Sequence, residues 1–367
     1  MKTKCILHSI LYAFIGGTIL TGCMNEDLED SNPTNDPVES GTYLLNEGSW
    51  GSNNANITYF NPTEKVGKLS DMYASNNGNS KLGDVANAML EEDGNIYVLL
   101  NGSKYVARLD LQTKEQARYT FPEGEGEPRC MDVKDNYVYI TQYGGQVTKL
   151  NSKDMTLAGT FKGGANLEGI VVKDGKLYVA NSYIQEGSGN FVYFKEVFVI
   201  DAKTLTLESK IDVVDNPTKL YEIGNKIYLI SQGNYDDVPG ALQVIDTQKG
   251  TSKVILNDVT KITKGLEDMI YGIRSTFDAN RQPINSFFIY NEKTETTYET
   301  SYLQDAPSSL NSTAIYLLER DEKLGFIYVG TTDYQNTGTI YQFDKNGKLI
   351  QSFDSGGINP STMLFID

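Results

Sequence analysis

One short pattern recurs seven times along the chain: an apolar strand that carries a tyrosine, usually placed directly after a turn of Gly, Asn or Asp. The seven tyrosines are Tyr43, Tyr97, Tyr139, Tyr178, Tyr228, Tyr271 and Tyr328. Successive tyrosines are 39 to 57 residues apart, close to the period of about 40–50 residues that is typical of the blades of a β-propeller. The repeat therefore predicts an all-β fold of seven similar units.

Each unit divides into four short strands, and the two ends of the chain complement each other. In the last full unit we predict four strands, at 314–320, 326–331, 339–344 and 348–353. One spare strand follows at 362–366. The first unit begins at Tyr43 without its first strand, which the spare strand can supply, so that the ring closes without a free sheet edge. We predict a seven-bladed β-propeller of four-stranded blades over residues 42–367. A β-sandwich or two smaller β domains would leave the missing strand and the spare strand unexplained.

The first 22 residues have the features of a leader. Lys2 and Lys4 precede a mostly apolar run at 6–20, which is too short to span a membrane comfortably. The sequence Leu20-Thr21-Gly22-Cys23 resembles the lipobox of bacterial lipoproteins. We expect a signal peptide at 1–22 and lipid chains on Cys23 that attach the protein to the outer membrane. The alternative is a plain secretory peptide with an incidental cysteine.

Residues 23–41 are predicted to form a flexible tether. Acidic residues follow Cys23 directly, and a stretch rich in Ser, Asn and Pro continues to Ser40. An acidic run at this place resembles the surface-export signal of Bacteroidota lipoproteins, so we expect the protein to face the cell exterior. A solvated linker that faces the periplasm is the alternative.

Without the leader, the chain is strongly acidic and has no histidine. It keeps 30 basic and 48 acidic residues, a net charge of −18, and it loses His8. Such a charge disfavours nucleic acid as a partner. The missing imidazole rules out Ser-His-Asp and Cys-His catalysis and any metal site that needs histidine. With Cys5 removed and Cys23 lipidated, Cys130 has no partner for an intrachain disulfide.

The turns predict one plain rim and one elaborated rim. The turns between the first and second strands, and between the third and fourth, are tight and rich in Asp-Gly, Asn-Gly and Gly-Asn. The other connections lie on the opposite rim of the ring, and the loops after the second strands are longer there: 49–56, 183–194, 233–240, 275–285 and 332–338. A rigid scaffold with one elaborated face is typical of a binding protein.

The elaborated face gathers aromatic and amide side chains. Aromatic rings offer contact area at little entropic cost, and amides offer hydrogen bonds without net charge, which suits a large, polar, nearly neutral ligand. The predicted ligand-binding residues are Asn46, Trp50, Asn53, Asn54, Asn79, Arg129, Gln142, Tyr143, Asn181, Tyr183, Gln232, Tyr235, Arg274, Phe277, Tyr334 and Gln335. The alternative for each is structural: a loop tyrosine packs on the next blade, and an asparagine shapes a turn.

Other chemistry has weaker support in the sequence. Asp236, Asp237 and Asp333 lie in loops, but no run resembles an aspartate-rich calcium loop. No spacing singles out a pair of carboxylates for glycoside hydrolysis. We therefore expect no catalytic residues, no metal and no cofactor, and a protein that is not an enzyme.

Several stretches resemble a known family. They are Asn46-Glu47-Gly48, Ser52-Asn53-Asn54-Ala55, Lys81 to Ala86, Asp333-Tyr334-Gln335, Gly347 to Ile350 and Ile358-Asn359-Pro360. With the propeller repeat and the lipobox, they resemble the YncE-like surface lipoproteins of Bacteroidota (DUF5074 type), and within these the BtuG-type proteins that capture cobalamin. The likeness covers residues 42–367 in outline and is strongest at the two ends.

The resemblance implies a function and partners. It implies that the protein binds cobalamin or a related corrinoid as its transported ligand and delivers it to a TonB-dependent outer-membrane transporter. The alternatives are capture of a glycan, of a metal chelate or siderophore, or a structural or adhesive role without a small ligand. An anionic siderophore needs a cationic cluster, and the elaborated face has few basic residues: Arg129, Lys195, Arg274 and Arg281.

Overall fold

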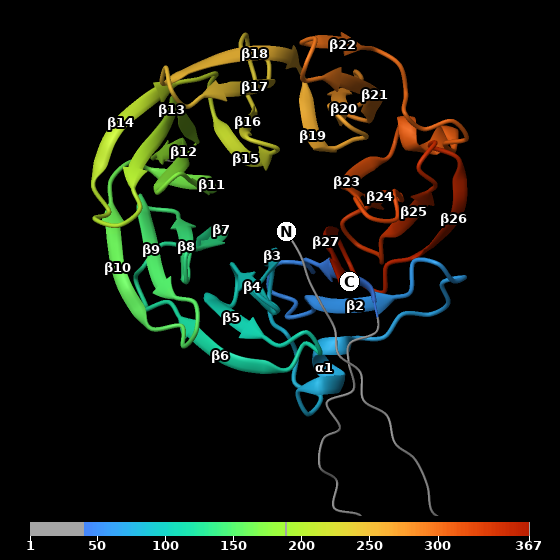
Figure 1. The fold of residues 1–367 in the computed structure, drawn as a ribbon, viewed down its shortest axis with the longest axis horizontal. Helices are drawn as coiled ribbons and strands as arrows, with labels where there is room; N and C mark the ends of the chain where they lie inside the picture. Colours follow the sequence, from blue (N-terminus) through green and yellow to red (C-terminus); the bar gives the residue numbers. More distant parts are fainter. Residues whose placement is uncertain (1–39, 188, 367) are drawn as a thin grey trace, which may run out of the picture. The chain divides into compact units, whose positions relative to one another are not determined.

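The computed structural model describes residues 40–187 and 189–366. Within these ranges the chain forms seven antiparallel sheets arranged in a ring, with one strand of each sheet nearest the centre (Figure 1). The predicted seven-bladed β-propeller is therefore confirmed. The predicted signal peptide, Cys23 and nearly all of the tether lie outside the described residues.

Six sheets have four strands in chain order, from an inner strand to an outer strand. The first is β3 (Ala86–Glu92), β4 (Asn95–Leu100), β5 (Tyr105–Leu109) and β6 (Glu115–Thr120). The second is β7 (Pro128–Lys134), β8 (Tyr137–Gln142), β9 (Gln146–Asn151) and β10 (Leu157–Lys162). The third is β11 (Asn166–Lys173), β12 (Lys176–Glu186), β13 (Asn190–Asp201) and β14 (Leu207–Asp212).

The remaining four-stranded sheets continue the same order around the ring. The fourth is β15 (Pro217–Ile223), β16 (Lys226–Ser231), β17 (Ala241–Asp246) and β18 (Thr251–Asn257). The fifth is β19 (Val259–Lys264), β20 (Met269–Phe277), β21 (Pro283–Asn291) and β22 (Thr296–Tyr298). A short 3₁₀ helix, η1 (Ser308–Asn311), precedes the sixth, which is β23 (Ala314–Arg320), β24 (Ile327–Thr332), β25 (Thr339–Phe343) and β26 (Leu349–Asp354).

The seventh sheet joins the two ends of the propeller. Its inner strand is β27 (Pro360–Ile366), which pairs with β1 (Gly41–Asn46), and β1 pairs in turn with β2 (Asn56–Phe60). This closure is the predicted one, although the closing sheet has three strands where the other sheets have four. Within the described residues, the chain that follows β2 forms no fourth strand. Instead, Val66 N–H donates to Gln351 Oε1 (3.0 Å) of the neighbouring sheet, and the chain then forms helix α1 (Met72–Asn76).

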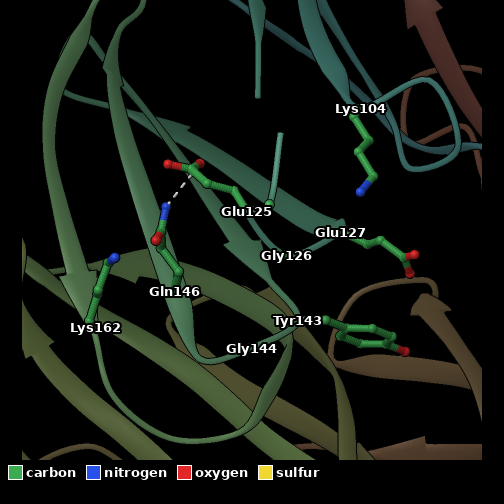
Figure 2. A pocket seen from close by; sticks show the side chains of 9 residues that line it. Lys104, Glu125, Gly126, Glu127, Tyr143, Gly144, Gln146 and Lys162 are labelled. Atoms are coloured by element: carbon green, nitrogen blue, oxygen red, sulfur yellow. Dashed lines mark hydrogen bonds between the residues drawn. The ribbon is translucent and has the colours of Figure 1, made fainter. Parts of the chain in front are cut away.

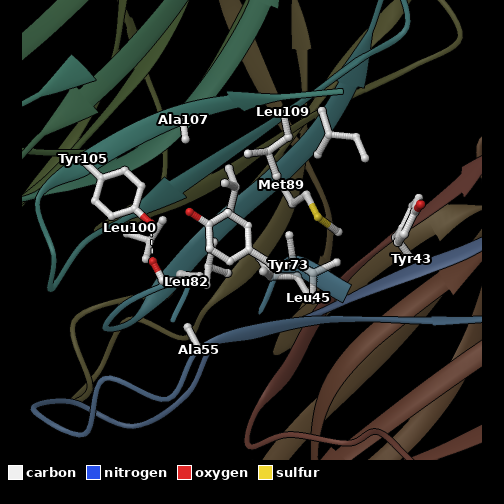
Figure 3. Packing of buried hydrophobic residues seen from close by; sticks show 14 of the residues in the cluster. Tyr43, Leu45, Ala55, Tyr73, Leu82, Met89, Leu100, Tyr105, Ala107 and Leu109 are labelled. Carbon is white, nitrogen blue, oxygen red and sulfur yellow. Dashed lines mark hydrogen bonds between the residues drawn. The ribbon is translucent and has the colours of Figure 1, made fainter. Parts of the chain in front are cut away.

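The repeated tyrosines explain how neighbouring sheets are held together. Their rings are buried between sheets, as in the cluster around Tyr43 (Figure 3), and several hydroxyls reach the next sheet. Tyr43 donates to Leu111 O (2.6 Å), Tyr97 to Ser152 O (3.3 Å) and Tyr139 to Ala202 O (3.3 Å). Each acceptor lies in the turn between the third and fourth strands of the following sheet. One tyrosine per repeat thus supplies both apolar area and a polar link.

Candidate functional site

An irregularity recurs at the start of the inner strands. In all seven, the register with the partner strand shifts near the first residues, as in a β-bulge. A bulge leaves residues unpaired and re-aims their side chains. The inner-strand residues skipped in the pairing are Asn87, Arg129, Cys130, Glu168, Gly169, Thr218, Thr260, Tyr316 and Ser361.

These bulges surround a cavity at the centre of the ring. The cavity has a volume of about 540 Å³, within the range of small-molecule sites. All seven inner strands contribute to its wall, with Asn87, Arg129, Glu168, Lys219, Lys261, Tyr316 and Thr362 among the lining residues. Four of the predicted ligand-binding residues also line it: Arg129, Tyr183, Gln232 and Tyr235. Four of the sixteen predicted residues therefore line a cavity to which every blade contributes.

One side of the wall is a closed polar network. Arg129 Nε donates to Glu168 Oε2 (3.2 Å), and its guanidinium lies 4.7 Å from the ring centre of Tyr143. Tyr143 donates its hydroxyl to Glu168 Oε1 (2.7 Å), and Tyr183 donates to the Tyr143 hydroxyl oxygen (3.4 Å). Burial and the Glu168 carboxylate raise the pKa of Tyr143 far above its ordinary value. The phenol therefore stays protonated and remains a donor.

The network continues across the ring to the closing sheet. With its amide oriented to satisfy both neighbours, Asn87 accepts from Arg129 Nη1 (3.0 Å) and donates to Glu47 Oε1 (3.2 Å). Tyr316 donates its hydroxyl to the other oxygen of Glu47. Burial raises the pKa of Glu47, an effect that the Tyr316 hydrogen bond partly offsets. Residues from four different sheets are thus linked through side chains alone.

The remaining wall carries charged residues that the sequence prediction missed. Lys219 on β15, Lys261 on β19 and Glu319 on β23 all line the cavity. Burial raises the pKa of Glu319 to about 7, with the two lysines opposing this rise. Burial and the adjacent Lys219 lower the pKa of Lys261 well below its ordinary value. A sequence signal does exist: Glu168, Lys219, Lys261 and Tyr316 each stand third in their inner strand.

Four predicted aromatic residues lie exposed on this face, three of them in loops and Phe277 at the end of β20. Trp50, Tyr235, Phe277 and Tyr334 expose 65%, 72%, 71% and 58% of their surface. Tyr334 also packs edge-on against Tyr316 of the cavity wall, with ring centres 6.1 Å apart. A single exposed apolar side chain is common on a protein surface, so the informative feature is that all four lie at or just after the end of the second strand of a sheet, on the same rim. These rings are available to a ligand in the structure as it stands.

Trp50 is held up by the loop between β1 and β2. Gly48 has φ +81°, and a Cβ there would lie 2.7 Å from Ala55 N, so this bend requires glycine. Asn54 Oδ1 accepts from Ser49 N–H (2.8 Å), which closes the loop across its base. Asn53, also a predicted ligand residue, is exposed with φ 49° at the loop tip. The ring of Trp50 therefore faces solvent and does not fill the turn.

A row of aromatic rings borders the cavity on the opposite side. It consists of Tyr143, Tyr183, Phe191, Tyr193 and Tyr235, with successive ring centres 5.8 to 6.3 Å apart. The long hairpin of β12 and β13 supplies the three central rings. Phe191 and Tyr193 were not among the predicted residues. They lie in a loop predicted at 183–194 that the structure folds as strand.

Three predicted amides are buried behind this surface. Asn46 donates to Asn56 Oδ1 (2.9 Å), Gln142 donates to Gly126 O (3.1 Å), and Asn181 donates to Glu196 Oε1 (2.8 Å). All three side chains are at most 1% exposed. Their hydrogen bonds stabilise the loops, so they support the face from within the fold.

Three other predicted residues, Asn79, Arg274 and Gln335, do not line the cavity. Asn79 follows α1, whose Asn76 donates to Gln112 O (2.6 Å) in a turn on the plain rim. Its expected place beside the central opening is therefore wrong, because the helix carries this connection around the outside of the first four-stranded sheet. Arg274 is engaged by Glu299 (3.2 Å) and Asp258 (3.7 Å). Gln335 is exposed beside Tyr334.

A second, more open cavity of about 500 Å³ lies between the first two four-stranded sheets. Lys104, Glu125, Glu127, Tyr143 and Lys162 line it, and Gln146 donates to Glu125 (3.2 Å) (Figure 2). Its acidic and basic side chains are balanced, and Tyr143 connects it to the polar network of the central cavity. We regard it as a side branch of the same face.

Among residues 40–187 and 189–366, no three or more His, Cys, Asp or Glu side chains are grouped so that they could hold a metal ion. No helix in the same part of the chain is long and apolar enough to cross a membrane.

The sequence was compared with known families and proteins. A domain of unknown function, DUF5074, matches residues 40–221. This part of the chain is similar to the DUF5074 domain. The match runs from the strands of the closing sheet into β15, which is just under half of the chain. No curated protein matches the sequence.

Solved structures with a similar fold have low sequence identity. Hydrazine synthase of Kuenenia stuttgartiensis is 15% identical, with a TM-score of 0.54 over 69% of this chain and 74% of that chain. The computationally designed protein Ika8 is 12% identical, with a TM-score of 0.52 over 87% and 88% of the two chains. BamB of Moraxella catarrhalis is 11% identical, with a TM-score of 0.50 over 88% and 85%. At these identities the likeness shows the propeller fold alone.

Proposed function

We propose that this protein is a lipid-anchored, outer-surface binding protein that captures cobalamin or a related corrinoid and delivers it to a TonB-dependent outer-membrane transporter. The observation that carries the proposal is the ring of exposed aromatic side chains on the face where the central cavity opens: Trp50, Tyr235, Phe277 and Tyr334. The sequence resemblance to the BtuG-type lipoproteins and the match to DUF5074 support it.

The geometry fits a ligand that is larger than the cavity. A cavity of about 540 Å³ can take one edge of a corrin ring system, while the aromatic residues above it cover the remainder. Flat aromatic side chains contribute large contact area with few rotatable bonds. The polar wall offers hydrogen bonds to the amide groups at the edge of a corrin ring. Balanced charges in the wall, with Arg129 paired to Glu168, suit a ligand with little net charge.

The proposal assigns no catalysis to the site. Phenols and amides dominate the face, and the carboxylates Glu47 and Glu168 are engaged by tyrosine or arginine. Such groups bind and orient a ligand. Capture followed by release to a transporter needs no chemical step.

Trp50 provides a direct test because it is the single tryptophan of the chain. Cyanocobalamin is titrated into the purified protein, and binding is followed by the emission of Trp50 and independently by isothermal titration calorimetry. We expect saturable quenching and a matching heat. Trp50→Phe removes the optical signal, so its affinity is taken from calorimetry, as is that of Tyr334→Ala.

A matched control separates the face from the surface in general. Tyr298 on the outer strand β22 is 45% exposed, and Tyr298→Ala should leave the affinity unchanged. Tyr334→Ala should weaken binding by about ten-fold, as expected for an aromatic contact residue. No heat with cyanocobalamin would contradict the ligand. Binding that is unaffected by both Trp50→Ala and Tyr334→Ala would contradict the location. Heat with an oligosaccharide instead would assign a glycan.

A further inference from the structure

Two lysines stand side by side in the cavity wall. Lys219 is the third residue of β15 and Lys261 is the third residue of β19, the inner strands of neighbouring sheets. Both side chains line the central cavity, where the two amines lie close enough to influence each other's pKa. The Lys261 ammonium also lies 5.4 Å from the ring centre of Tyr316.

Neither lysine has a counter-ion. Among the residues that the structure describes, no carboxylate oxygen lies within 4.0 Å of either amine. The other cation of the wall, Arg129, is by contrast held at 3.2 Å by Glu168. Glu319 and Glu47 act on the lysine pair only at longer range. With a pKa of about 7, Glu319 also carries only part of a negative charge at neutral pH.

A second positive charge in this partly desolvated cavity is costly. Burial and the neighbouring Lys219 both disfavour the charged form of Lys261. The pKa of Lys261 is lowered well below its ordinary value for these reasons, burial first and Lys219 second. An opposite charge placed beside the two amines favours the charged form of Lys261 and offsets the cost of burying it. The lysine pair is therefore the part of the wall best suited to a negatively charged group.

We propose that Lys219 and Lys261 form a binding subsite for an oxyanion, namely a phosphate or phosphate-ester group of the ligand that enters the cavity. The two amines offer several N–H donors to one group of oxygens, and charge-assisted hydrogen bonds of this kind are the strong ones. The subsite rests on the proposed function only in sharing its cavity. It also changes the expected charge of the ligand, because the two lysines can bind an anionic group on the ligand and the loop residues alone cannot.

The test uses inorganic phosphate as the probe and titration calorimetry of the full chain as the measurement. Dimethyl phosphate is titrated in parallel, so that a free phosphate site is distinguished from a site for a phosphate ester within a larger ligand. We expect Lys219→Met and Lys261→Met each to weaken binding by about ten-fold or more. Lys203→Met is the matched control, because Lys203 is exposed in a turn of the plain rim, and it should change the affinity less than two-fold.

Proton uptake gives a second readout. An anion between the lysines raises the pKa of Lys261, so binding draws a proton from the buffer near neutral pH. The heat of binding should then change with the ionisation enthalpy of the buffer, and this dependence should vanish in Lys261→Met. The other titratable and charged groups that line the cavity with Lys261 are Glu47, Arg129, Cys130, Glu168, Tyr183, Lys219, Tyr221, Tyr235, Tyr316 and Glu319.

The outcomes are separable. The double variant Lys219→Met/Lys261→Met should melt at or above the wild-type temperature, because it removes two amines from a partly desolvated cavity in which neither has an ion-pair partner among the described residues. Absence of heat with both phosphate probes, or unchanged binding in the double variant, would overturn the subsite. Phosphate binding without cyanocobalamin binding would overturn the proposed function and leave the subsite intact. If cyanocobalamin binds and neither phosphate probe does, the subsite is overturned and the proposed function is kept.

Discussion

The wall of the central cavity and the rim above it use side chains in opposite ways. In the wall, Arg129, Glu168 and Tyr143 are bound to one another across two sheets. On the rim, Trp50 and Phe277 expose most of their surface and pack on little. The mutually bound residues Arg129, Glu168 and Tyr143 should therefore contribute mainly to the stability of the ring, and the exposed rim residues mainly to the affinity for a ligand. The difference separates residues that build the site from residues that use it.

The largest effect should come from breaking the ion pair of the wall. Glu168→Ala leaves the guanidinium of Arg129 half-buried without its carboxylate and removes the acceptor of the Tyr143 hydroxyl. We expect the free energy of unfolding to fall by about 3 kcal/mol. Urea denaturation measures the loss. The double variant Arg129→Met/Glu168→Leu should recover part of this loss. A loss below about 0.5 kcal/mol in Glu168→Ala would contradict the prediction, because the ion pair would then contribute no more to stability than an exposed one.

The second prediction concerns the pH dependence of stability. Glu319 has a pKa of about 7 in the folded protein against an ordinary value of 4.5, so the folded state holds a proton that the unfolded state has already lost. Stability from this group therefore falls as the pH rises from 4.5 to 7, by about 2–3 kcal/mol. Glu319→Gln stays neutral and should lose this slope.

The variant is needed because other carboxyls share the direction. Burial also raises the pKa of Glu47, Asp71 and Asp132. The difference between the unfolding free energies of wild type and Glu319→Gln, measured at each pH, isolates Glu319. A difference that stays constant between pH 4.5 and 7 would contradict the assigned burial of this side chain.

The third prediction tests the rim. Tyr235→Ala and Phe277→Ala should each reduce the affinity for the captured ligand by about 1 kcal/mol and change the free energy of unfolding by less than about 0.5 kcal/mol. Phe277 is the cleaner case, because Tyr235 also packs against Tyr193 at 5.8 Å. A fall in stability without a change in affinity would contradict the prediction, because Tyr235 and Phe277 would then stabilise the fold and not contact the ligand.

The sequence was sufficient for the fold because its signals are local and repeated. One tyrosine per unit, hairpin turns of Asp-Gly and Asn-Gly, and the spare strand at the C-terminus each predict the same ring. The missed element is the fourth strand of the closing sheet. Residues 61–71 pair instead with side chains such as Gln351 of the adjacent sheet, a contact between segments about 285 residues apart that no local pattern encodes.

The site was harder to predict than the fold for a physical reason. Loop aromatics such as Trp50 and Phe277 are recognisable because nothing in a turn requires them. Lys219 and Lys261 lie inside strands, where a charged residue is normally assigned to the solvent side. The bulges at the starts of the inner strands and the closure of the ring bring Lys219 and Lys261 to the same central cavity, and neither feature can be read from the local sequence. The prediction for Asn79 was wrong for a different reason. It assumed that the connection leading to β3 runs beside the central opening, whereas the short helix α1 places this connection elsewhere.

The smallest effect should arise at Asn54, in the loop between β1 and β2 that carries Trp50. Its Oδ1 accepts from Ser49 N–H (2.8 Å) and thereby fixes the loop that presents Trp50. Asn54→Ala removes one partly exposed hydrogen bond, so the unfolding free energy should fall by about 1 kcal/mol or less. The anisotropy of Trp50 emission should fall as well, because the loop gains freedom, and ligand affinity should weaken only by the cost of ordering it again. Asn53→Ala, one residue away and exposed, is the matched control. If anisotropy and affinity are both unchanged in Asn54→Ala, the orientation of Trp50 is set by the glycine bend at Gly48 and not by the amide.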